Sequence, residues 1–292
     1  MNFRDLTYLV AVVDLQNFTK AADRCAVSQP TLSNQIKKLE DYLGVSLFER
    51  NNKKVMPTEA CLKISQSARL IINETDAIKD LAALAKDPFA YRFSLGAFPT
   101  LANYIFPSFV NKVVASLPQF KPVLIEDKTK TLLDKLLIGE LDAALIALPV
   151  SDEKLSSRAL FDDDFFLAVS SSHVLADKKE IAQEELAHHK LLLLEEGHCM
   201  RYQALDICQR HKIEEQDFRA SSMETLQQMV KAGMGITLVP KLALKEKEPG
   251  ICYVPFKAPA PKRTIGLVWR KSSLRVEAIN AIIALLSANY GN

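Results

Sequence analysis

Apolar residues recur at helical spacing throughout the first 58 residues. Three sets follow one another: Leu6, Leu9, Val10 and Val13; Phe18, Ala21 and Ala22; and Leu32, Ile36 and Leu39. Positions three or four apart share one face of a helix, so each set predicts the buried face of an amphipathic helix. Between the second and third sets, Ser28 is suited to cap a helix and Pro30 to occupy its first turn. The pattern therefore predicts a helix, a tight turn and a second helix.

A second pattern indicates one long helix over residues 59–87. Two series of residues recur every seven positions: Ile64, Ile71, Ile78 and Ala85, and, three residues before them, Cys61, Ala68, Thr75 and Ala82. A seam sustained for about four heptads is typical of helix pairs between subunits. The alternative is a helix that packs only on its own domain. In either case Cys61 is expected to fill the seam.

From residue 91 onward short apolar runs alternate with helical stretches, which predicts α/β units around a largely parallel sheet. The predicted strands are 91–98, 121–126, 142–148, 165–170, 190–196, 235–240, 251–256 and 264–270. The predicted helices lie near 101–116, 129–139, 200–211, 223–232 and 275–289. The segment AKDPFA at 85–90 marks the expected hinge between the two parts of the chain.

Composition narrows the class of protein. A length of 292 residues suggests two or three domains, and 48% hydrophobic with 25% charged residues excludes a disordered chain. The net charge of +2 gives no strong attraction of the whole chain to nucleic acid or to a membrane surface. No apolar stretch approaches the roughly 20 residues that span a bilayer. The five scattered cysteines are unlike a disulfide framework, and with no signal sequence evident we expect a cytoplasmic protein.

Any nucleic-acid site must therefore be local, and the second helix of the N-terminal module is the candidate. It carries short polar side chains able to read base edges in a major groove, with lysines for phosphates. A turn-rich basic hairpin follows it and is suited to grip the backbone as a wing. Residues 17–58 hold seven Lys or Arg and four acids, so the module is only mildly basic. Charge alone leaves DNA binding and a plain helical interaction domain both open.

The run FTKAADRCAVSQPTLSNQIKKLEDYLGVSLFER, followed by MPTEA, resembles the winged helix-turn-helix of LysR-type transcriptional regulators. The resemblance implies a winged helix-turn-helix at 1–58, a dimerising linker helix at 59–88 and a regulatory domain at 89–292. It also implies that the regulatory domain has two lobes, similar to periplasmic binding proteins: lobe one at 91–162 plus 270–292, and lobe two at 163–269. The DNA-binding residues expected from the pattern and the resemblance are Gln29, Pro30, Thr31, Ser33, Gln35, Lys37, Arg50, Lys53 and Lys54.

The segment LLLLEEGHCMRYQALDICQRH at 191–211 carries two cysteines on a predicted helix. Cys199 lies near the helix start, where the helix dipole, His198 and Arg201 favour a thiolate, and Cys208 lies near the end. Nine residues of helix span about 13.5 Å. A disulfide needs Cα atoms within about 7 Å, so bonding these two cysteines requires the helix to unwind. The alternative is a pair of small buried hydrophobes.

The chain resembles the OxyR peroxide-sensor subfamily of LysR-type regulators. The resemblance is carried by the residues GHC, R, QA and C of this segment and by the runs RASSMETLQQMVKAGMGITL and KRTIGLVWR. The resemblance implies that peroxide oxidises Cys199 to a sulfenic acid, which Cys208 resolves to a disulfide. It places Thr100, Thr129, His198, Arg201 and Arg263 around the peroxide, although Thr100 and Thr129 could simply cap helices. Tyr202 departs from the subfamily, which carries Asp there.

These residues predict a DNA-binding transcriptional activator that forms homodimers, which assemble further into tetramers. Hydrogen peroxide is expected to switch it, and glutaredoxin or thioredoxin to reduce it again. No enzymatic turnover, metal or cofactor is expected. Three alternatives remain. The chain could be a LysR-type regulator that binds a metabolite between its lobes, with structural cysteines. It could be a thiol peroxidase, which the DNA module argues against. A transport binding protein is disfavoured by the missing signal peptide.

Overall fold

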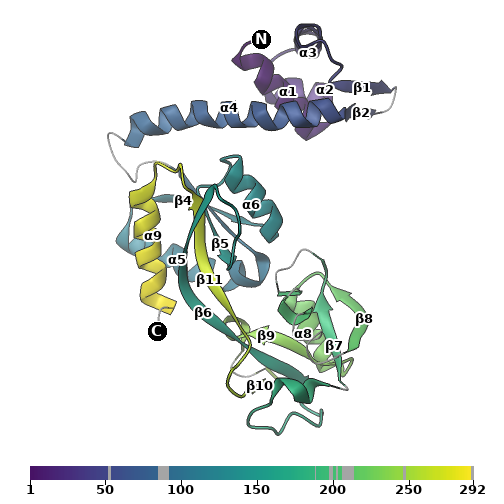
Figure 1. The fold of residues 1–292 in the computed structure, drawn as a ribbon, viewed down its shortest axis with the longest axis vertical. Helices are drawn as coiled ribbons and strands as arrows, with labels where there is room; N and C mark the ends of the chain where they lie inside the picture. Colours follow the sequence, from purple (N-terminus) through teal and green to yellow (C-terminus); the bar gives the residue numbers. More distant parts are fainter. Residues whose placement is uncertain are drawn as a thin grey trace. The chain divides into compact units, whose positions relative to one another are not determined.

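The structure is a computed structural model that describes residues 1–51, 54–84, 92–187, 189–196, 200–201, 203–205, 214–245 and 248–290 (Figure 1). The chain divides into two units, one of residues 1–86 with 138–140 and one of residues 87–137 with 141–292. Among the described residues, no helix combines the length and the apolar character that crossing a bilayer requires.

The N-terminal unit is three helices, a two-stranded hairpin and one long helix. In order these are α1 (Phe3–Leu15), α2 (Phe18–Arg24), α3 (Gln29–Leu43), β1 (Phe48–Asn51), β2 (Lys54–Pro57) and α4 (Glu59–Leu84). The predicted apolar sets form its core: Leu9, Ala21, Leu32 and Ile36 are fully buried, whereas Val13 is only half-buried. The hairpin is antiparallel, with Phe48 opposite Pro57 and Asn51 opposite Lys54. The helix, turn, helix and wing expected from the sequence are therefore present.

The C-terminal unit is mixed α/β. Its elements are β3 (Arg92–Ala97), α5 (Pro99–Ser116), β4 (Lys121–Glu126), α6 (Thr129–Leu137), β5 (Ala143–Ala147), β6 (Leu155–Ser170), η1 (Gln183–Leu186), β7 (Lys190–Leu194), β8 (Glu214–Ala220), α8 (Met223–Lys231), β9 (Thr237–Pro240), η2 (Lys241–Ala243), β10 (Ile251–Pro255), β11 (Lys262–Arg270) and α9 (Val276–Tyr290). The main sheet has the order β10-β6-β11-β5-β3-β4, with β9 also paired to β6. A separate pair joins β7 and β8.

The prediction of a largely parallel sheet is wrong. Only β3 pairs in parallel with its two neighbours, β4 and β5, in the main sheet, whereas β5–β11, β11–β6, β6–β10 and β6–β9 are antiparallel. The reason is that one long strand, β6, leaves the first half of the unit and β11 returns beside it. Two strands that carry the chain out and back must run in opposite directions.

Two hydrophobic cores divide this unit into lobes. Lobe one contains β3, β4, β5, the helices α5, α6 and α9, and the adjoining parts of β6 and β11. Lobe two contains the remainder of β6 with β7, β9, β10 and α8. The family resemblance predicts that lobe two spans residues 163–269, but Ile265, Leu267 and Val268 pack in the core of lobe one. The chain thus returns to lobe one at the beginning of β11, where that strand pairs with β5 and with the lobe-one part of β6.

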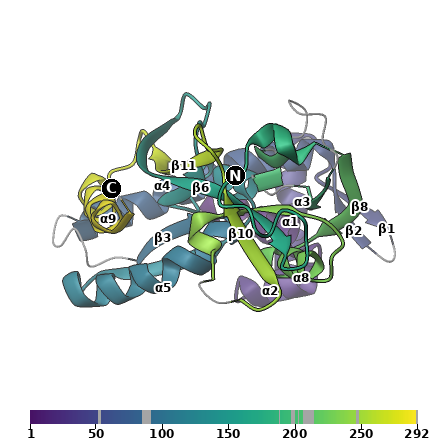
Figure 2. The ribbon, with the colours of Figure 1, turned by 90° about the horizontal axis from the view of Figure 1, so that it is seen from below.

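Helices cover both faces of the lobe-one sheet. Right-handed connections around the parallel strands β4, β3 and β5 place α5 and α6 on opposite faces, and α9 lies beside α5 (Figures 1 and 2). The approach of α6 is close at Gly96, where a Cβ atom would lie 2.7 Å from Leu132 Cδ2. Glycine at this position therefore lets α6 pack directly on the sheet.

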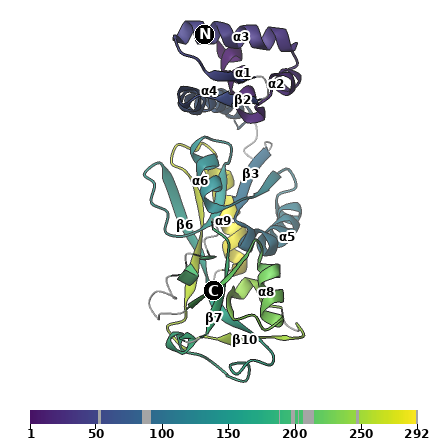
Figure 3. The same cartoon turned by 90° about the vertical axis from the view of Figure 1, so that its right-hand side faces the viewer.

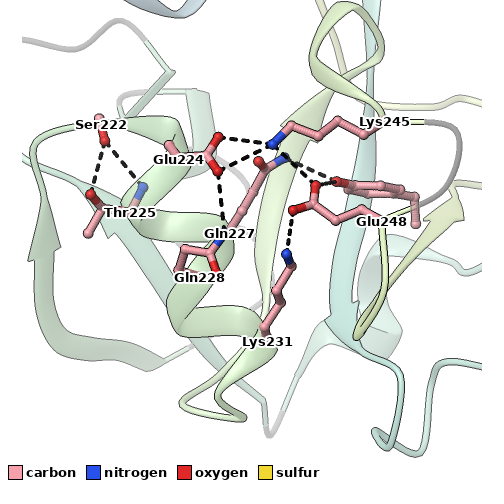
Figure 4. A network of polar contacts seen from close by, with 9 residues as sticks. Ser222, Glu224, Thr225, Gln227, Gln228, Lys231, Lys245 and Glu248 are labelled. Carbon is pink, nitrogen blue, oxygen red and sulfur yellow. Dashed lines mark hydrogen bonds and ion pairs between the residues drawn. The ribbon is translucent and has the colours of Figure 1, made fainter.

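A polar network joins the elements of lobe two (Figure 4). Lys245 lies 3.0 Å from Glu224 of α8 and 3.3 Å from Glu248. Glu248 also pairs with Lys231 at the end of α8 and accepts a bond of 3.5 Å from the Tyr253 hydroxyl of β10. Burial first and then the neighbouring Glu248 carboxylate raise the pKa of Tyr253 to about 12. The network holds α8 against the residues that precede β10.

Candidate functional site

The start of α3 presents the predicted DNA-reading residues to solvent. The Ser28 hydroxyl accepts the Thr31 amide at 3.3 Å, and Pro30 lies in the first turn, so the helix begins at Gln29 as predicted. Gln29, Pro30, Thr31 and Lys37 are exposed, and Ser33 is half-buried. The opposite face is apolar and buried. An exposed polar face on the second helix of a helix-turn-helix can enter a major groove.

The turn between α2 and α3 depends on a left-handed residue. Ala26 has a φ of 53°, and the next amide, that of Val27, donates to the Ala22 carbonyl at 3.0 Å. This bond closes the turn directly over the buried Ala21–Ala22 pair. The small side chains at those two positions allow α2 to cross closely beneath α3. In Figure 3, α3 runs along one edge of the N-terminal unit.

A contact that the sequence analysis missed joins Gln35 to α1. The Gln35 side chain donates through Nε2 to Asp5 Oδ1 at 2.7 Å. Asp5 is only 4% exposed, and its other oxygen, Oδ2, accepts the Asn2 backbone amide at 2.7 Å. Thirty residues separate Asp5 from Gln35, so periodicity within either helix could not reveal the pair. An Asp on the buried side of α1 was the one available signal.

The predicted wing is attached to α3 through Glu40. The Glu40 Oε1 atom accepts hydrogen bonds from the backbone amides of Leu47 at 2.7 Å and Phe48 at 3.3 Å. These bonds hold the start of β1 against α3. Arg50 and Lys54 lie on β1 and β2, with their side chains outside the described part of the structure. Lys53 lies outside the described residues altogether.

The heptad seam of α4 has two different environments. Cys61 and Ala68 are buried in the N-terminal unit, as the alternative of packing on its own domain requires. Ile71 and Ile78 belong to the other series and are 47% and 66% exposed. An exposed isoleucine stripe on a long helix is a surface typical of helix pairing. One part of the seam therefore serves the domain core, and the other is available to a partner.

In the C-terminal unit, Thr100 and Arg263 meet in a buried cluster. Arg263 is 1% exposed and donates through Nη1 to Thr100 Oγ1 at 3.0 Å and through Nη2 to the Thr100 carbonyl at 3.1 Å. Its Nε and Nη2 both donate to Asp163 Oδ2, at 3.0 and 2.8 Å. All three guanidinium nitrogens are therefore engaged, and the Thr100 hydroxyl is bound to Arg263 instead of capping α5.

Thr129 occupies the equivalent place after the neighbouring strand. Thr100 and Thr129 each lie three residues beyond the end of their strands, and these ends, Ala97 and Glu126, are paired in register. The Thr129 hydroxyl is buried and has no hydrogen-bond partner among the described residues, so it does not cap α6. A buried hydroxyl without a partner is costly and is characteristic of functional positions. It lines a cavity of about 310 Å³ beside α6 in lobe one.

The other predicted redox-site residues are only partly described. Arg201 is half-buried and donates through Nη1 to the Leu194 carbonyl at 3.3 Å, at the end of β7. His198, Cys199 and Cys208 lie outside the described residues, as does Tyr202. The structure therefore neither brings the two cysteines together nor separates them.

A lysine of lobe one bonds to the segment that leads to Cys199, a contact the sequence analysis also missed. Lys128, between β4 and α6, lies 3.0 Å from Glu195 Oε1 and donates to the Glu196 carbonyl at 2.9 Å. Both acceptors directly follow β7 in lobe two. The contact therefore links the two lobes within three or four residues of Cys199.

The remaining cysteines belong to other elements. Burial first and then the Glu40 carboxylate raise the pKa of Cys61 to about 11, so its thiol stays protonated at neutral pH. Burial also raises the pKa of Cys25, against a smaller opposite effect of Arg24. Cys252 lies half-buried in β10. Within the described ranges, no three His, Cys, Asp or Glu side chains converge in the way that metal ligands do.

Comparisons with known proteins cover both units. The model of the bacterial regulatory helix-turn-helix protein, lysR family, matches residues 3–62, and the model of the LysR substrate binding domain matches residues 86–291. The hydrogen peroxide-inducible genes activator of Pectobacterium carotovorum is 43% identical over 94% of this chain and 91% of its own length. The DNA-binding transcriptional dual regulator OxyR of Escherichia coli is 41% identical over 94% of this chain and 90% of its own.

Solved structures agree with the sequence comparisons. Full-length OxyR of Pseudomonas aeruginosa, with a cysteine-to-aspartate substitution, matches 98% of this chain and 94% of its own at a TM-score of 0.79 and 37% identity. An OxyR cysteine-to-serine mutant of Corynebacterium glutamicum with H2O2 bound matches 99% of this chain and 92% of its own, at 0.68 and 32%. With both units matched over nearly their whole length, the chain belongs to the LysR family of transcriptional regulators and, within it, to the OxyR group.

Proposed function

We propose that this protein is a hydrogen-peroxide-responsive transcriptional activator that is switched by a reversible disulfide between Cys199 and Cys208. One observation carries the proposal. Relatives named hydrogen peroxide-inducible genes activator match 94% of the chain, and both cysteines are present in the segment where the OxyR resemblance requires them. The protein signals through this chemistry and does not turn over peroxide as an enzyme.

The chemistry balances as a two-electron oxidation of two thiols. The Cys199 thiolate attacks one oxygen of H2O2, the O–O bond breaks, hydroxide leaves and takes up a proton, and Cys199 becomes a sulfenic acid. The Cys208 thiolate then attacks the sulfenic sulfur, the S–O bond breaks and a second water leaves. Glutaredoxin or thioredoxin supplies the two electrons that restore both thiols.

Thr100, Thr129, His198 and Arg201 form the proposed surroundings of the peroxide, and Arg263 acts through Thr100. The free hydroxyl of Thr129 supports a direct contact, because it is a buried donor and acceptor with no other partner among the described residues. Arg263 has each guanidinium nitrogen engaged, so we assign it to holding Thr100 in place. Disulfide formation then disturbs the segment after β7, which Lys128 links to lobe one.

The proposed output is a change in how paired winged helices contact duplex DNA. Gln29, Pro30, Thr31, Ser33 and Gln35 read the major groove, while Lys37, Arg50, Lys53 and Lys54 neutralise phosphates. Two copies pair through the exposed stripe of α4 that contains Ile71 and Ile78, and two such dimers form a tetramer. Since both the DNA and the thiol reductants are in the cytoplasm, we assign the protein to that compartment.

The decisive experiment maps disulfides after stoichiometric H2O2. Reduced protein is oxidised, alkylated and digested, and the peptides are identified by mass spectrometry without reduction. Cys199→Ser and Cys208→Ser serve as matched controls, and the half-buried Cys25 and Cys252 report non-specific oxidation. We expect a Cys199–Cys208 crosslink in the wild type alone.

Two other outcomes would favour the rival functions. If both thiols stay reduced while an exposed thiol oxidises, the protein is a metabolite-responsive LysR regulator, and a metabolite must then change its DNA binding. If peroxide is consumed continuously with a thiol reductant, at many turnovers per minute, the protein is a thiol peroxidase.

A further inference from the structure

We propose that Asp5 is a positioning residue that fixes which atom of the Gln35 amide faces DNA, so that Gln35 recognises a hydrogen-bond donor on a base edge. Adenine, through its N6 amino group, and cytosine, through its N4 amino group, present such donors in the major groove. The inference rests on the proposed DNA-binding function and adds to it the class of base that this position reads.

The geometry begins with the buried carboxylate. Asp5 is 4% exposed, and among the described residues each of its oxygens accepts one hydrogen bond. Oδ2 accepts the Asn2 backbone amide at 2.7 Å and so completes the capping box of α1, while Oδ1 accepts Gln35 Nε2 at 2.7 Å. One oxygen thus stabilises the start of α1, and the other holds a side chain of α3.

The chemistry of the two groups then sets the orientation. An ionised carboxylate only accepts hydrogen bonds, whereas an amide has a donor end and an acceptor end. Only Nε2 of Gln35 can therefore face Asp5, and Oε1 must occupy the other end. No hydrogen bond to Oε1 comes from the described residues. Without Asp5, rotation by 180° about the last side-chain bond would exchange the two ends freely.

The position of Gln35 on α3 makes this orientation relevant to DNA. Gln35 is half-buried and lies one helical turn from the exposed Thr31 and from Lys38, on the helix that the family uses to read DNA. A fixed Oε1 accepts from adenine or cytosine and faces guanine O6 or thymine O4, which are also acceptors, unfavourably. Preference at the contacted base should reach at least about fivefold, which corresponds to about 1 kcal/mol, the lower end of the cost of one mismatched base pair.

Asp5→Asn gives a directional test. Because the Asn2 amide still needs an acceptor, the new Asn must turn its oxygen toward that amide and its NH2 group toward Gln35. Gln35 then turns Oε1 inward and presents its own NH2 group, so the preferred bases become guanine or thymine. In the double variant Asp5→Asn/Gln35→Glu, the Glu accepts from the new Asn and presents its second oxygen outward. The double variant should therefore restore the preference for adenine or cytosine.

The probe is a pool of random duplex DNA, from which full-length protein selects sequences that are then counted by sequencing. Gln35→Ala identifies the base position that Gln35 contacts, because only there should its preference disappear. We expect at least a fivefold preference for adenine or cytosine in the wild type, inversion in Asp5→Asn and restoration in the double variant. Asn2→Ala is the matched control: it removes the bond of 3.1 Å from the Asp5 amide to the Asn2 side chain and leaves Asp5–Gln35 intact. It should lower the melting temperature without changing base preference.

Three results would overturn the inference. Asp5→Asn could select the same bases as the wild type and lose only thermal stability, which would make the role of Asp5 structural. Gln35→Ala could leave every preference unchanged, in which case Gln35 reads no base. Inversion in Asp5→Asn without restoration in the double variant would contradict the assigned amide geometry. Failure of the proposed function has a different signature, since wild-type protein would then enrich no sequence at all.

Discussion

Arg263 of β11 stands directly opposite Asp163 of β6, and both side chains are almost completely buried. The preceding residue, Lys262, stands opposite Asp164 but pairs diagonally with Asp162 at the surface, at 2.6 Å and with side chains 53% and 42% exposed. The two pairs have the same charges on the same strands but differ in burial. They allow the effect of burial on an ion pair to be measured within one structure.

Arg263→Met should lower the free energy of unfolding by about 3–5 kcal/mol, because it leaves the Asp163 carboxylate buried without its partner. Lys262→Met should cost less than about 1 kcal/mol, since water solvates Asp162. Denaturant unfolding followed through Trp269, the single tryptophan of the chain, reports directly on β11. If the two variants lose the same free energy of unfolding, the buried Arg263–Asp163 pair contributes no more to stability than the exposed Lys262–Asp162 pair.

Thr100→Val and Thr129→Val should separate stability from peroxide chemistry. Thr100→Val removes the acceptor of Arg263 Nη1 and should cost about 1–3 kcal/mol. Thr129→Val removes a hydroxyl that has no partner among the described residues, so the free energy of unfolding should stay unchanged or rise by up to about 1 kcal/mol. Both variants should slow the oxidation of Cys199 by H2O2, followed by stopped-flow. A Thr129→Val protein that is destabilised and oxidises at the normal rate would remove Thr129 from the peroxide site.

Ile78→Asp should dissociate the proposed dimer. Ile78 is 66% exposed on α4, and a carboxylate within an apolar helix pair cannot be solvated there. Light scattering during gel filtration should show monomers at micromolar concentration, with DNA affinity reduced at least tenfold. Gln66→Asp, an equally charged change at another exposed position of α4, should leave the assembly intact. If both variants remain assembled, the copies associate elsewhere.

Glu248 should make lobe two sensitive to acid. Hydrogen bonds from Lys231 and then Lys245 lower its pKa below the usual 4.5, although burial acts in the opposite direction. A carboxyl with a depressed pKa in the folded state contributes stability above its unfolded pKa and loses it as the pH falls through the folded value. Glu248→Gln should therefore lower the melting temperature at pH 7, and its difference from wild type should shrink as the pH falls from 5 toward 3.

Circular dichroism measures this pH profile. The control is Glu184→Gln, at an exposed position of lobe two, which should leave the melting temperature close to that of wild type across the range. A Glu248→Gln difference that stays constant from pH 7 to pH 3 would mean that lost packing, and not lost charge, accounts for the destabilisation.

Strands with an apolar sequence could be predicted closely, and strands with a charged sequence could not. The run KPVLIE predicts β4 at its observed bounds. By contrast, the prediction for β6 begins at 165, whereas the strand begins at Leu155. The part of β6 that was not predicted contains three consecutive aspartates, and such a charged run is typical of a loop. Two of them are neutralised across the strand by Lys262 and Arg263, a tertiary effect that local hydropathy does not contain.

In the candidate site, too, local features could be predicted from the sequence and contacts between separate elements could not. The start of α3 followed from Ser28 and Pro30, because capping is local. The bonds from Arg263 to Thr100 and from Gln35 to Asp5 connect residues 163 and 30 positions apart. Such contacts form only when separate elements meet, so their residue types were visible in the sequence but their pairing was not.

The out-and-back path of β6 and β11 has a consequence for synthesis. The core of lobe one needs Ile265, Leu267 and Val268 of β11, and then Ile279 and Ile282 of α9, all of which leave the ribosome after lobe two. A nascent chain that ends before β11 therefore leaves the backbone edge of β5 unpaired and the lobe-one core incomplete. Chaperone binding to arrested chains should persist until β11 and α9 have both emerged, and then fall sharply.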